Sequence, residues 1–429
     1  MAGAGGPRPS SGQHPTRLTE AISLGVLARL VHPDLVDEVI AECGRRERRV
    51  RLLPARVVVY YVLALCLFAG EGYEEVMRRL VGGLEVLRSW QQTWRVPTTG
   101  AITQARGRLG AGVLAELFVR VARPLAGPGT PGAWLAGWRL MAIDGTVVDV
   151  PETTANDGAF GRLGGNGQPA PYPQVKVVGL AECGTHALVD AAIGACATDE
   201  RALADEVLGS LAPGMLLMAD RGYYSYDFWE TAAASGADLL WRLQAGIPLA
   251  FDRALADGSW LATITRPADR RAHHDHQRGK GRKPTRPAAT VTVRVIEYEV
   301  TDRGTEDVCL ITTILDPDEA SAAELAAAYH QRWEAESAFA QLKTRLLDHH
   351  QVLRSKSPEL VRQELWALLT VHYAICELIT HAAATIDTDP DRISFLRAVR
   401  VARRQVTAQA ALSPPPASPR ADHGPGRDR

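Results

Sequence analysis

The sequence contains no uninterrupted apolar run long enough to span a membrane and no cysteine pair at the spacing of a zinc ribbon. None of its apolar stretches approaches the roughly 18 residues that a membrane helix needs, and its amino-terminal segment has no hydrophobic signal sequence. The six cysteines are scattered without a C-x-x-C pair, which argues against a zinc ribbon and against a disulfide framework. These absences favour a cytoplasmic protein with reduced thiols and no membrane contact.

A strong charge of one sign is also missing, but the net charge of −1 hides two basic clusters. Residues 1–130 contain 17 arginines and no lysine against 11 acidic residues, and residues 266–286 contain eight basic residues against two aspartates. Binding to a phosphate backbone depends on local clusters of this kind rather than on the total charge. A charged segment is also often just a solvated surface, so both interpretations stay open for each cluster.

Two aspartates end apolar runs. Asp144 closes the run LMAID just before Gly145 and Thr146, and Asp220 closes the run MLLMAD. Each pattern predicts a buried strand that delivers an acid at or near its carboxyl end, where open α/β sheets place their sites. Because a buried carboxylate is unfavourable without a cation or another partner, these acids are candidates for a metal site.

A third candidate acid lies in the run AYHQRWEAESAFAQLKTRLL, whose periodicity predicts one helix. Tyr329, Arg332, Glu336 and Lys343 project within roughly a 60° arc of that helix. On a helix taken alone, the stripe would most simply be a solvated face with ordinary charge pairs. Together with two strand-borne aspartates, however, the glutamate would complete an oxygen-rich site of the kind that Mg²⁺ or Mn²⁺ occupies.

At these residues the sequence resembles the DDE transposases of the insertion-sequence-four type. The helix signature of that family is Tyr, two residues, Arg, three residues, Glu, six residues, Lys, and the four helix residues above match it in full. The first acid is followed by Gly-Thr and the second lies in Ala-Asp-Arg-Gly-Tyr, as in the family. The resemblance extends upstream to Leu53–Tyr61 and downstream to Leu353–Leu369, and so covers roughly residues 17–385.

The resemblance implies metal-dependent DNA strand cleavage and strand transfer, which is the chemistry of cut-and-paste transposition. It implies as partners the terminal inverted repeats of the chain's own element and target DNA, a homodimer in the synaptic complex, and a bacterial, nucleoid-associated location in the cytoplasm. The cofactor it implies is Mg²⁺ or Mn²⁺, as two ions. The site residues it implies are Asp144, Asp220 and Glu336 as catalytic residues and metal ligands, and Tyr329, Arg332 and Lys343 as contacts to DNA phosphates.

The predicted fold class is α/β, with a ribonuclease H-like catalytic core interrupted by a β-rich insertion. An all-helical N-terminal domain precedes the core and C-terminal helices follow it. The predicted parts are a disordered tail at 1–16, a helical DNA-binding domain at 17–124, the first part of the core at 138–236, the insertion at 237–316 with an exposed basic loop at 266–286, the Glu-bearing core helix at 317–350, C-terminal helices at 351–412 and a disordered tail at 413–429.

Within the N-terminal domain, the segment after Pro97 resembles the end of a helix-turn-helix and offers Arg106 and Arg108 to DNA. A purely structural helical bundle is the alternative for this piece. For the whole chain, the alternatives are a ribonuclease H-like nuclease that cuts without inserting and a domesticated DNA-binding regulator. Terminal inverted repeats flanking the coding region would distinguish a transposase from both.

Overall fold

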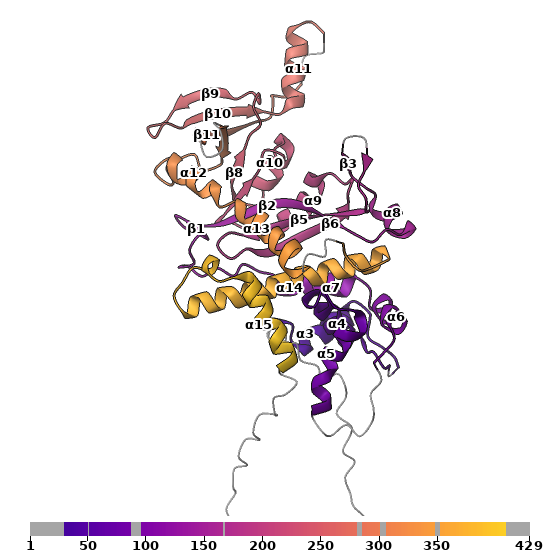
Figure 1. Ribbon diagram of the computed structural model, residues 1–429. Coiled ribbons are helices and arrows are strands. Elements are labelled where there is room, and N and C mark those ends of the chain that lie inside the picture. The colour runs from indigo at the N-terminus through magenta and orange to yellow at the C-terminus, as the bar shows by residue number, and fades with distance from the viewer. Residues whose placement is uncertain are drawn as a thin grey trace, which may run out of the picture.

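The computed structural model describes residues 30–49, 51–86, 96–165, 168–280, 285–300, 306–347 and 352–408. The two predicted tails, 1–16 and 413–429, lie outside these residues. The described chain has a mixed α/β architecture built on one large mixed sheet, which confirms the predicted α/β class (Figure 1). The helices lie above and below this sheet and at its ends.

Five strands form the half of the sheet that carries the predicted acids. In space their order is β6-β5-β2-β7-β8, with antiparallel pairing from β6 to β2 and parallel pairing from β2 to β8. Helices α9 (Glu200–Val207) and α10 (Tyr226–Ala233) lie in the connections that the parallel strands require. The bounds of the strands are β2 (Trp138–Asp149), β5 (Gln174–Glu182), β6 (Ala187–Ala195), β7 (Met215–Ala219) and β8 (Asp238–Arg242).

The segment predicted as a β-rich insertion, 237–316, continues the same sheet. Its first strand, β8, pairs in parallel with β7, so this strand joins the predicted insertion directly to the core sheet. Four antiparallel strands then extend the sheet from β8 in the order β12 (Glu306–Thr312), β11 (Thr290–Val300), β10 (Trp260–Thr265) and β9 (Ala250–Ala254).

The basic segment 266–286 contains a helix where the sequence predicts a loop. Helix α11 (Pro267–Gln277) begins with a proline in its first turn and has no buried residue. Proline is favourable at that position because its φ angle is already helical and because the first turn needs no amide donor there. The polar segment therefore starts a helix although none of its described side chains is buried. The helix projects from the far end of the sheet (Figure 1).

The predicted Glu-bearing helix is divided into three pieces. Helix α12 (Ala322–His330) begins with a capping box between Ser321 and Glu324. A turn at 331–332 separates it from α13 (Trp333–Ala340), and a π-helical segment, η2 (Gln341–Leu346), follows directly. Helical periodicity is nearly the same across such local changes of hydrogen bonding, which is why the sequence predicts one helix.

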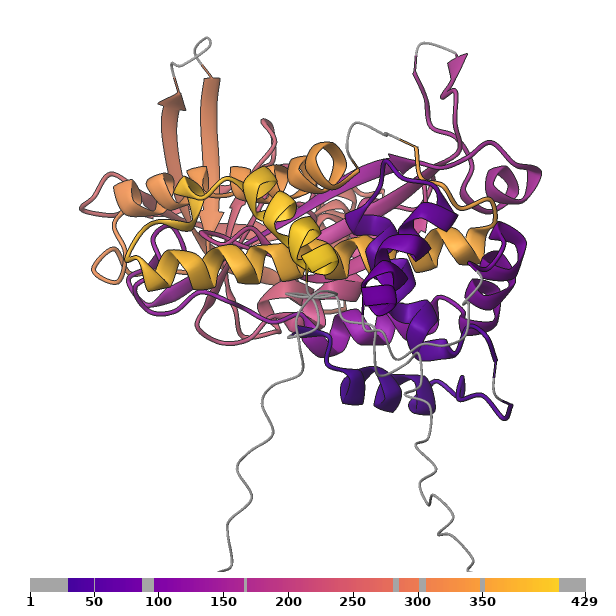
Figure 2. The same cartoon turned by 60° about the horizontal axis from the view of Figure 1, so that its bottom comes forward.

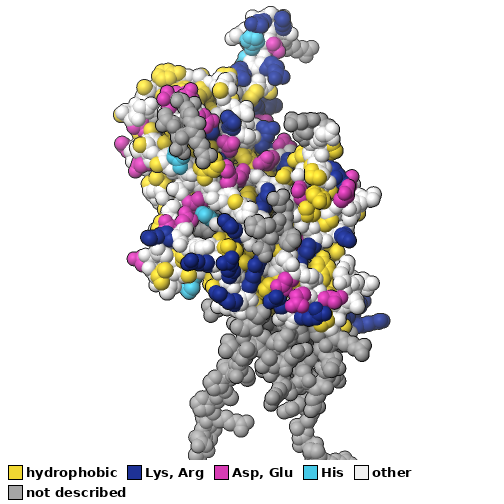
Figure 3. All heavy atoms as spheres, in the orientation of Figure 1, with side chains coloured by type: hydrophobic (Ala, Val, Ile, Leu, Met, Phe, Trp, Pro, Cys, Tyr) yellow, Lys and Arg dark blue, Asp and Glu magenta, His cyan; other side chains and the backbone are white. Residues whose placement is uncertain are grey.

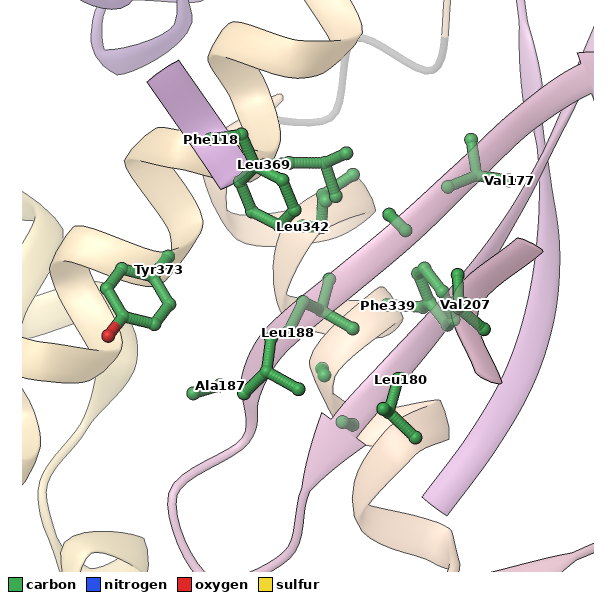
Figure 4. Packing of buried hydrophobic residues seen from close by; sticks show 14 of the residues in the cluster. Phe118, Val177, Leu180, Ala187, Leu188, Val207, Phe339, Leu342, Leu369 and Tyr373 are labelled. Atoms are coloured by element: carbon green, nitrogen blue, oxygen red, sulfur yellow. The ribbon is translucent and has the colours of Figure 1, made fainter. Parts of the chain in front are cut away.

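Helix α13 lies on one face of the sheet and α9 lies on the other. Phe339 of α13 packs over Gly179, where a Cβ atom would lie 3.0 Å from the ring. Figure 4 labels Phe339 together with Leu188, whose Cδ2 atom lies 2.9 Å from the same Cβ position. On the opposite face, Leu203 of α9 packs in the same way over Gly194. The two glycines therefore allow both helices to approach the sheet closely.

The N-terminal helices pack against a long C-terminal helix, α14 (Pro358–Thr385), which α15 (Phe395–Ala408) crosses (Figure 2). By length and composition α14 could span a membrane, but 67% of its most apolar window is buried against the sheet and the N-terminal helices. It is therefore the central core helix of this part of the protein. The N-terminal helices are α3 (Pro33–Glu42), α4 (Ala55–Leu67), α5 (Tyr73–Val86), α6 (Thr99–Leu109) and α7 (Gly112–Val121).

His372 of α14 is completely buried. Its Nε2 atom lies 3.3 Å from the Oε1 atom of Gln341, and its ring packs on Phe395 at 5.3 Å between centroids. Burial lowers the pKa of His372 to about 3. The imidazole is therefore neutral in the native protein and belongs to the core.

We expect this histidine to make the protein sensitive to acid. Between pH 6.5 and about 3 the unfolded chain binds a proton at His372 that the native state excludes, so the free energy of unfolding falls as the pH falls through this window. In urea titrations, His372→Gln should reduce this slope by up to about 1.4 kcal/mol per pH unit. His381→Gln, which changes an exposed histidine of the same helix, is the control. Equal slopes for the wild type and His372→Gln would contradict the neutral buried state.

Candidate active site

Asp144 and Asp220 occupy matching positions on adjacent parallel strands. Ala142 and Met218 are the last register pair of β2 and β7, and each aspartate comes two residues later. Strand β2 continues along β5 to Asp149, whereas β7 ends at Ala219. Both acids therefore lie where the sheet opens beyond the end of β7, which is the position that open α/β sheets use for their sites.

Arg332 links the third acid to the other two. Its guanidinium is buried, and Nη2 donates a hydrogen bond of 3.1 Å to the Oε1 atom of Glu336. Burial alone would lower the pKa of Arg332, but Tyr329, Asp220 and Glu336 raise it above its usual range. The guanidinium of Arg332 thus interacts electrostatically with both Asp220 and Glu336, which places these two acids in one electrostatic environment.

The surroundings of Asp144 have the electrostatics of a cation site. Burial is the main cause that raises the pKa of Asp144 to about 6, and the nearby Glu336 and Glu200 carboxylates act in the same direction, while the amide of Gly145 and the charge of Arg332 oppose the shift. A divalent cation would reverse this effect because it favours the ionised carboxylate. The donor set, which consists only of carboxylate oxygens, fits a hard ion such as Mg²⁺ or Mn²⁺.

Lys343 and Tyr329 both contact the segments that carry the aspartates. The Nζ atom of Lys343 donates a 3.1 Å hydrogen bond to Oγ1 of Thr146, two residues after Asp144. The Tyr329 hydroxyl donates to the carbonyl oxygen of Ala219, next to Asp220, at 3.3 Å, and its ring is buried. Tyr329, which the sequence predicts as a contact to DNA phosphate, thus holds α12 against the end of β7 through its hydroxyl.

Arg106 is not available to DNA, which corrects a prediction. Its side chain has 0% exposure. It donates hydrogen bonds to the Oε1 atom of Gln363 and the Oγ atom of Ser355, both at 2.9 Å, to the carbonyl oxygen of Leu360 at 3.2 Å and to the hydroxyl of Tyr73 at 2.9 Å. A buried guanidinium needs such partners, so Arg106 joins the N-terminal helices to α14.

Arg108, two residues later, is exposed. It lies at the rim of a surface pocket together with the segment that connects α3 and α4. The arginines that line this pocket are Arg45, Arg46, Arg48, Arg49, Arg51 and Arg108. Glu47 is the acidic residue among the lining side chains, so the pocket is strongly basic.

The sequence did not mark Glu200 and Tyr223, which contact Gly145 next to Asp144 and the Asp220 turn. The Tyr223 hydroxyl donates a 2.5 Å hydrogen bond to the Oε1 atom of Glu200. The Glu200 carboxylate lies directly against Gly145, where a Cβ atom would overlap it. The sequence offered two signals, the glycine at position 145 just after Asp144 and the tyrosine at position 223 three residues after Asp220. Neither signal points to Glu200 by itself.

A second group of ligand-type side chains, also missed, anchors the start of α13. Glu334 accepts a hydrogen bond from the amide of Gly184, and burial raises the pKa of Glu334 to about 7. The Nε2 atom of His186 lies 3.7 Å from Glu334 and 3.1 Å from Asp391. These contacts tie the first turn of α13, and therefore Glu336, to the turn between β5 and β6.

Comparison with known proteins identifies the class of this site. Residues 137–373 match the family model described as the transposase DDE domain, and residues 21–119 match the one described as the insertion element 4 transposase N-terminal. The chain is therefore a DDE transposase, a class of enzyme that catalyses DNA cleavage and strand transfer.

Two related proteins show which family of DDE transposases the chain belongs to. The chain is 30% identical over 396 residues to the transposase InsG for insertion sequence element IS4 of Escherichia coli (strain K12), which covers 90% of this chain and 84% of that protein. It is 26% identical over 198 residues to the putative transposase InsZ of the same strain, over 46% of this chain and 63% of that protein. The chain belongs to the insertion-sequence-four family of DDE transposases, as its motifs predicted.

Among solved structures, the piggyBac transposase synaptic complex with hairpin DNA is similar to this chain. The similarity has a TM-score of 0.44 at 9% sequence identity, and it covers 90% of this chain and 80% of that one.

Proposed function

We propose that Asp144, Asp220 and Glu336 are the catalytic carboxylates of this transposase, in a ribonuclease H-like core, and that they hold two Mg²⁺ or Mn²⁺ ions. The observation that carries the proposal is the matching position of the two aspartates on β2 and β7, with Arg332 joining Glu336 to them. Bound divalent cations in such sites activate an attacking oxygen and stabilise the leaving oxygen. The chain's own residues position the DNA strand for this chemistry.

Arg332 and Lys343 are the proposed phosphate contacts. The Nε atom of Arg332 is buried without a hydrogen-bond partner among the described residues, so the guanidinium keeps donor capacity and charge beyond its bond to Glu336. Lys343 reaches Thr146 through a single hydrogen bond to a neutral hydroxyl, which a phosphate could replace. Tyr329 has a positioning role, since its hydroxyl holds the end of β7 beside Asp220.

The basic pocket around Arg108 supports DNA binding by the N-terminal region, which we propose for residues 17–124. Helix α11 carries a second group of basic and histidine side chains on a projecting part of the protein (Figure 3). Such separated basic surfaces suit a protein that holds an element end along its length. We therefore propose the terminal inverted repeats and the target as DNA partners, in the nucleoid of a bacterial cytoplasm.

The experiment that tests the function uses labelled DNA carrying the repeats that flank the chain's own coding region. With Mg²⁺ or Mn²⁺ we expect strand cleavage at the repeat end followed by joining to a target plasmid, and with EDTA we expect neither. A scrambled repeat is the control. Cleavage without joining would favour the nuclease alternative, and binding without cleavage would favour the regulator.

We further propose that the active assembly is a homodimer on two element ends, because one event must join both ends to one target. Mixtures of wild-type and Glu336→Ala chains should lose strand transfer faster than the wild-type fraction falls. A strictly linear loss, together with normal cleavage by one chain on one end, would contradict the dimer.

A further inference from the structure

Glu200 and Tyr223 connect the two strands that carry the aspartates. Tyr223 lies in the turn after β7, where its amide donates a 3.0 Å hydrogen bond to the carbonyl oxygen of Asp220. Its hydroxyl donates to Glu200, and the Glu200 carboxylate rests on Gly145. A chain of contacts therefore runs from the Asp220 turn, through Tyr223 and Glu200, to the residue after Asp144.

The Glu200 carboxylate has spare hydrogen-bonding capacity in this position. Tyr223 engages its Oε1 atom, while Oε2 has no hydrogen-bond partner among the described residues. The side chain is half-buried at the first residue of α9. A carboxylate that is fixed at one oxygen and open at the other can orient the shell around a metal site, as outer carboxylates do for metal ligands.

The alternative is that the glutamate serves α9 alone, because an acidic residue in a first turn favours the helix dipole. That role needs neither the tyrosine hydroxyl nor a glycine at position 145. The close approach to Gly145 also has a consequence that the dipole does not explain, since it brings a like charge to Asp144. Like charges gather at one place in a native protein mainly where a cation offsets their repulsion.

We propose that Glu200, anchored by the Tyr223 hydroxyl, is a positioning residue of the divalent-metal site that fixes the Asp220 turn against the Asp144 strand and adds a fourth carboxylate charge. This inference rests on the proposed metal site of Asp144, Asp220 and Glu336. It goes beyond that site because Glu200 comes from the opposite face of the sheet to Glu336.

The test is Mn²⁺ binding to the full-length chain without DNA. Binding is measured by calorimetry or from the electron-spin-resonance signal of free Mn²⁺. Glu200→Gln keeps a hydrogen-bond acceptor for Tyr223 but removes the charge, and it should weaken binding about 10- to 100-fold. Tyr223→Phe removes the anchor and keeps the charge, and it should weaken binding about 3- to 10-fold. Gly145→Ala should act like Glu200→Gln because its methyl group displaces the carboxylate.

Glu206→Gln is the matched control, since it removes the same charge from an exposed position of the same helix. It should bind Mn²⁺ within about twofold of the wild type. Unfolding temperatures in EDTA establish that each variant is folded, and Gly145→Ala and Tyr223→Phe keep the test decisive if Glu200→Gln does not fold.

The outcomes separate this inference from the metal site itself. If Asp144→Asn loses Mn²⁺ binding while Glu200→Gln binds like Glu206→Gln, the role of Glu200 is overturned and the site of three acids stands. If Asp144→Asn binds Mn²⁺ like the wild type, the proposed metal site fails, and the inference about Glu200 fails with it. Wild-type binding by Tyr223→Phe would overturn the anchoring role.

Discussion

Asp144→Asn, Asp220→Asn and Glu336→Gln are each expected to lower Mg²⁺-dependent cleavage of a labelled element end by roughly a thousandfold or more, as the loss of one member of a catalytic unit does. Each change preserves shape and removes one of the charges gathered at the end of β7. Binding of the end should change little, because the proposed phosphate contacts are the side chains of Arg332 and Lys343. Cleavage and gel-shift assays on the same preparations measure the two effects.

The same variants should also separate loss of chemistry from loss of fold. Since burial disfavours the ionised form of Asp144, Asp144→Asn should unfold in EDTA at the same temperature as the wild type or at a higher one. Mg²⁺ should then stabilise the wild type but not the variant. Asp205→Asn, which changes an exposed residue of α9, is the control and should leave cleavage intact. Wild-type cleavage by any one of the three variants would contradict the assignment of that acid.

Arg106→Ala is expected to have the largest effect on stability, a loss of about 3 kcal/mol in the free energy of unfolding. The substitution leaves Gln363, Ser355 and the Leu360 carbonyl without their buried donor and empties the space of a fully buried side chain. Urea unfolding of the full-length chain measures the loss.

Arg108→Ala is the contrasting variant from the same helix. Because Arg108 is exposed at the basic pocket, its removal should leave stability within about 0.5 kcal/mol of the wild type. It should instead weaken DNA binding and reduce the dependence of log affinity on log salt by about 0.9 for each phosphate that the arginine neutralises. Arg78→Ala, at an exposed position of α5 outside the pocket, is the control. Stability losses of equal size for Arg106→Ala and Arg108→Ala would contradict the assignment of one arginine to the core and the other to the surface.

Much of the site could be predicted because its signals are local in the chain. An acid that closes a short apolar run predicts the C-terminal part of a strand. Asp220 directly follows β7, whereas Asp144 lies inside β2, two residues beyond the last pair with β7. The spacing from Tyr329 to Lys343 predicts one face of a helix. Arg332 contacts both Tyr329 and Glu336 although the helix is interrupted at 331–332. The family follows from these motifs and is confirmed by the matches to known proteins.

Other features could not be predicted because their partners are far apart in the chain. Arg106 carries a charge and lies two residues before the exposed Arg108, so the sequence suggested a surface role. Its partner Gln363 lies 257 residues away, and no local pattern indicates that α6 and α14 meet. The pairing of β8 with β7 was missed for the same reason, since parallel register depends on a crossover rather than on a hairpin.

The sequence by itself determined the family and the mixed α/β class and marked three acids as candidates for the site, because apolar runs and motif spacing are properties of short segments. Only the tertiary structure decided which polar side chains face solvent. It buried Arg106, attached the Tyr329 hydroxyl to the end of β7 and placed Glu200 against Gly145. The physical reason is that burial and hydrogen bonding depend on the packing of segments distant in the chain, and a charged side chain shows its role only through the partners that this packing provides.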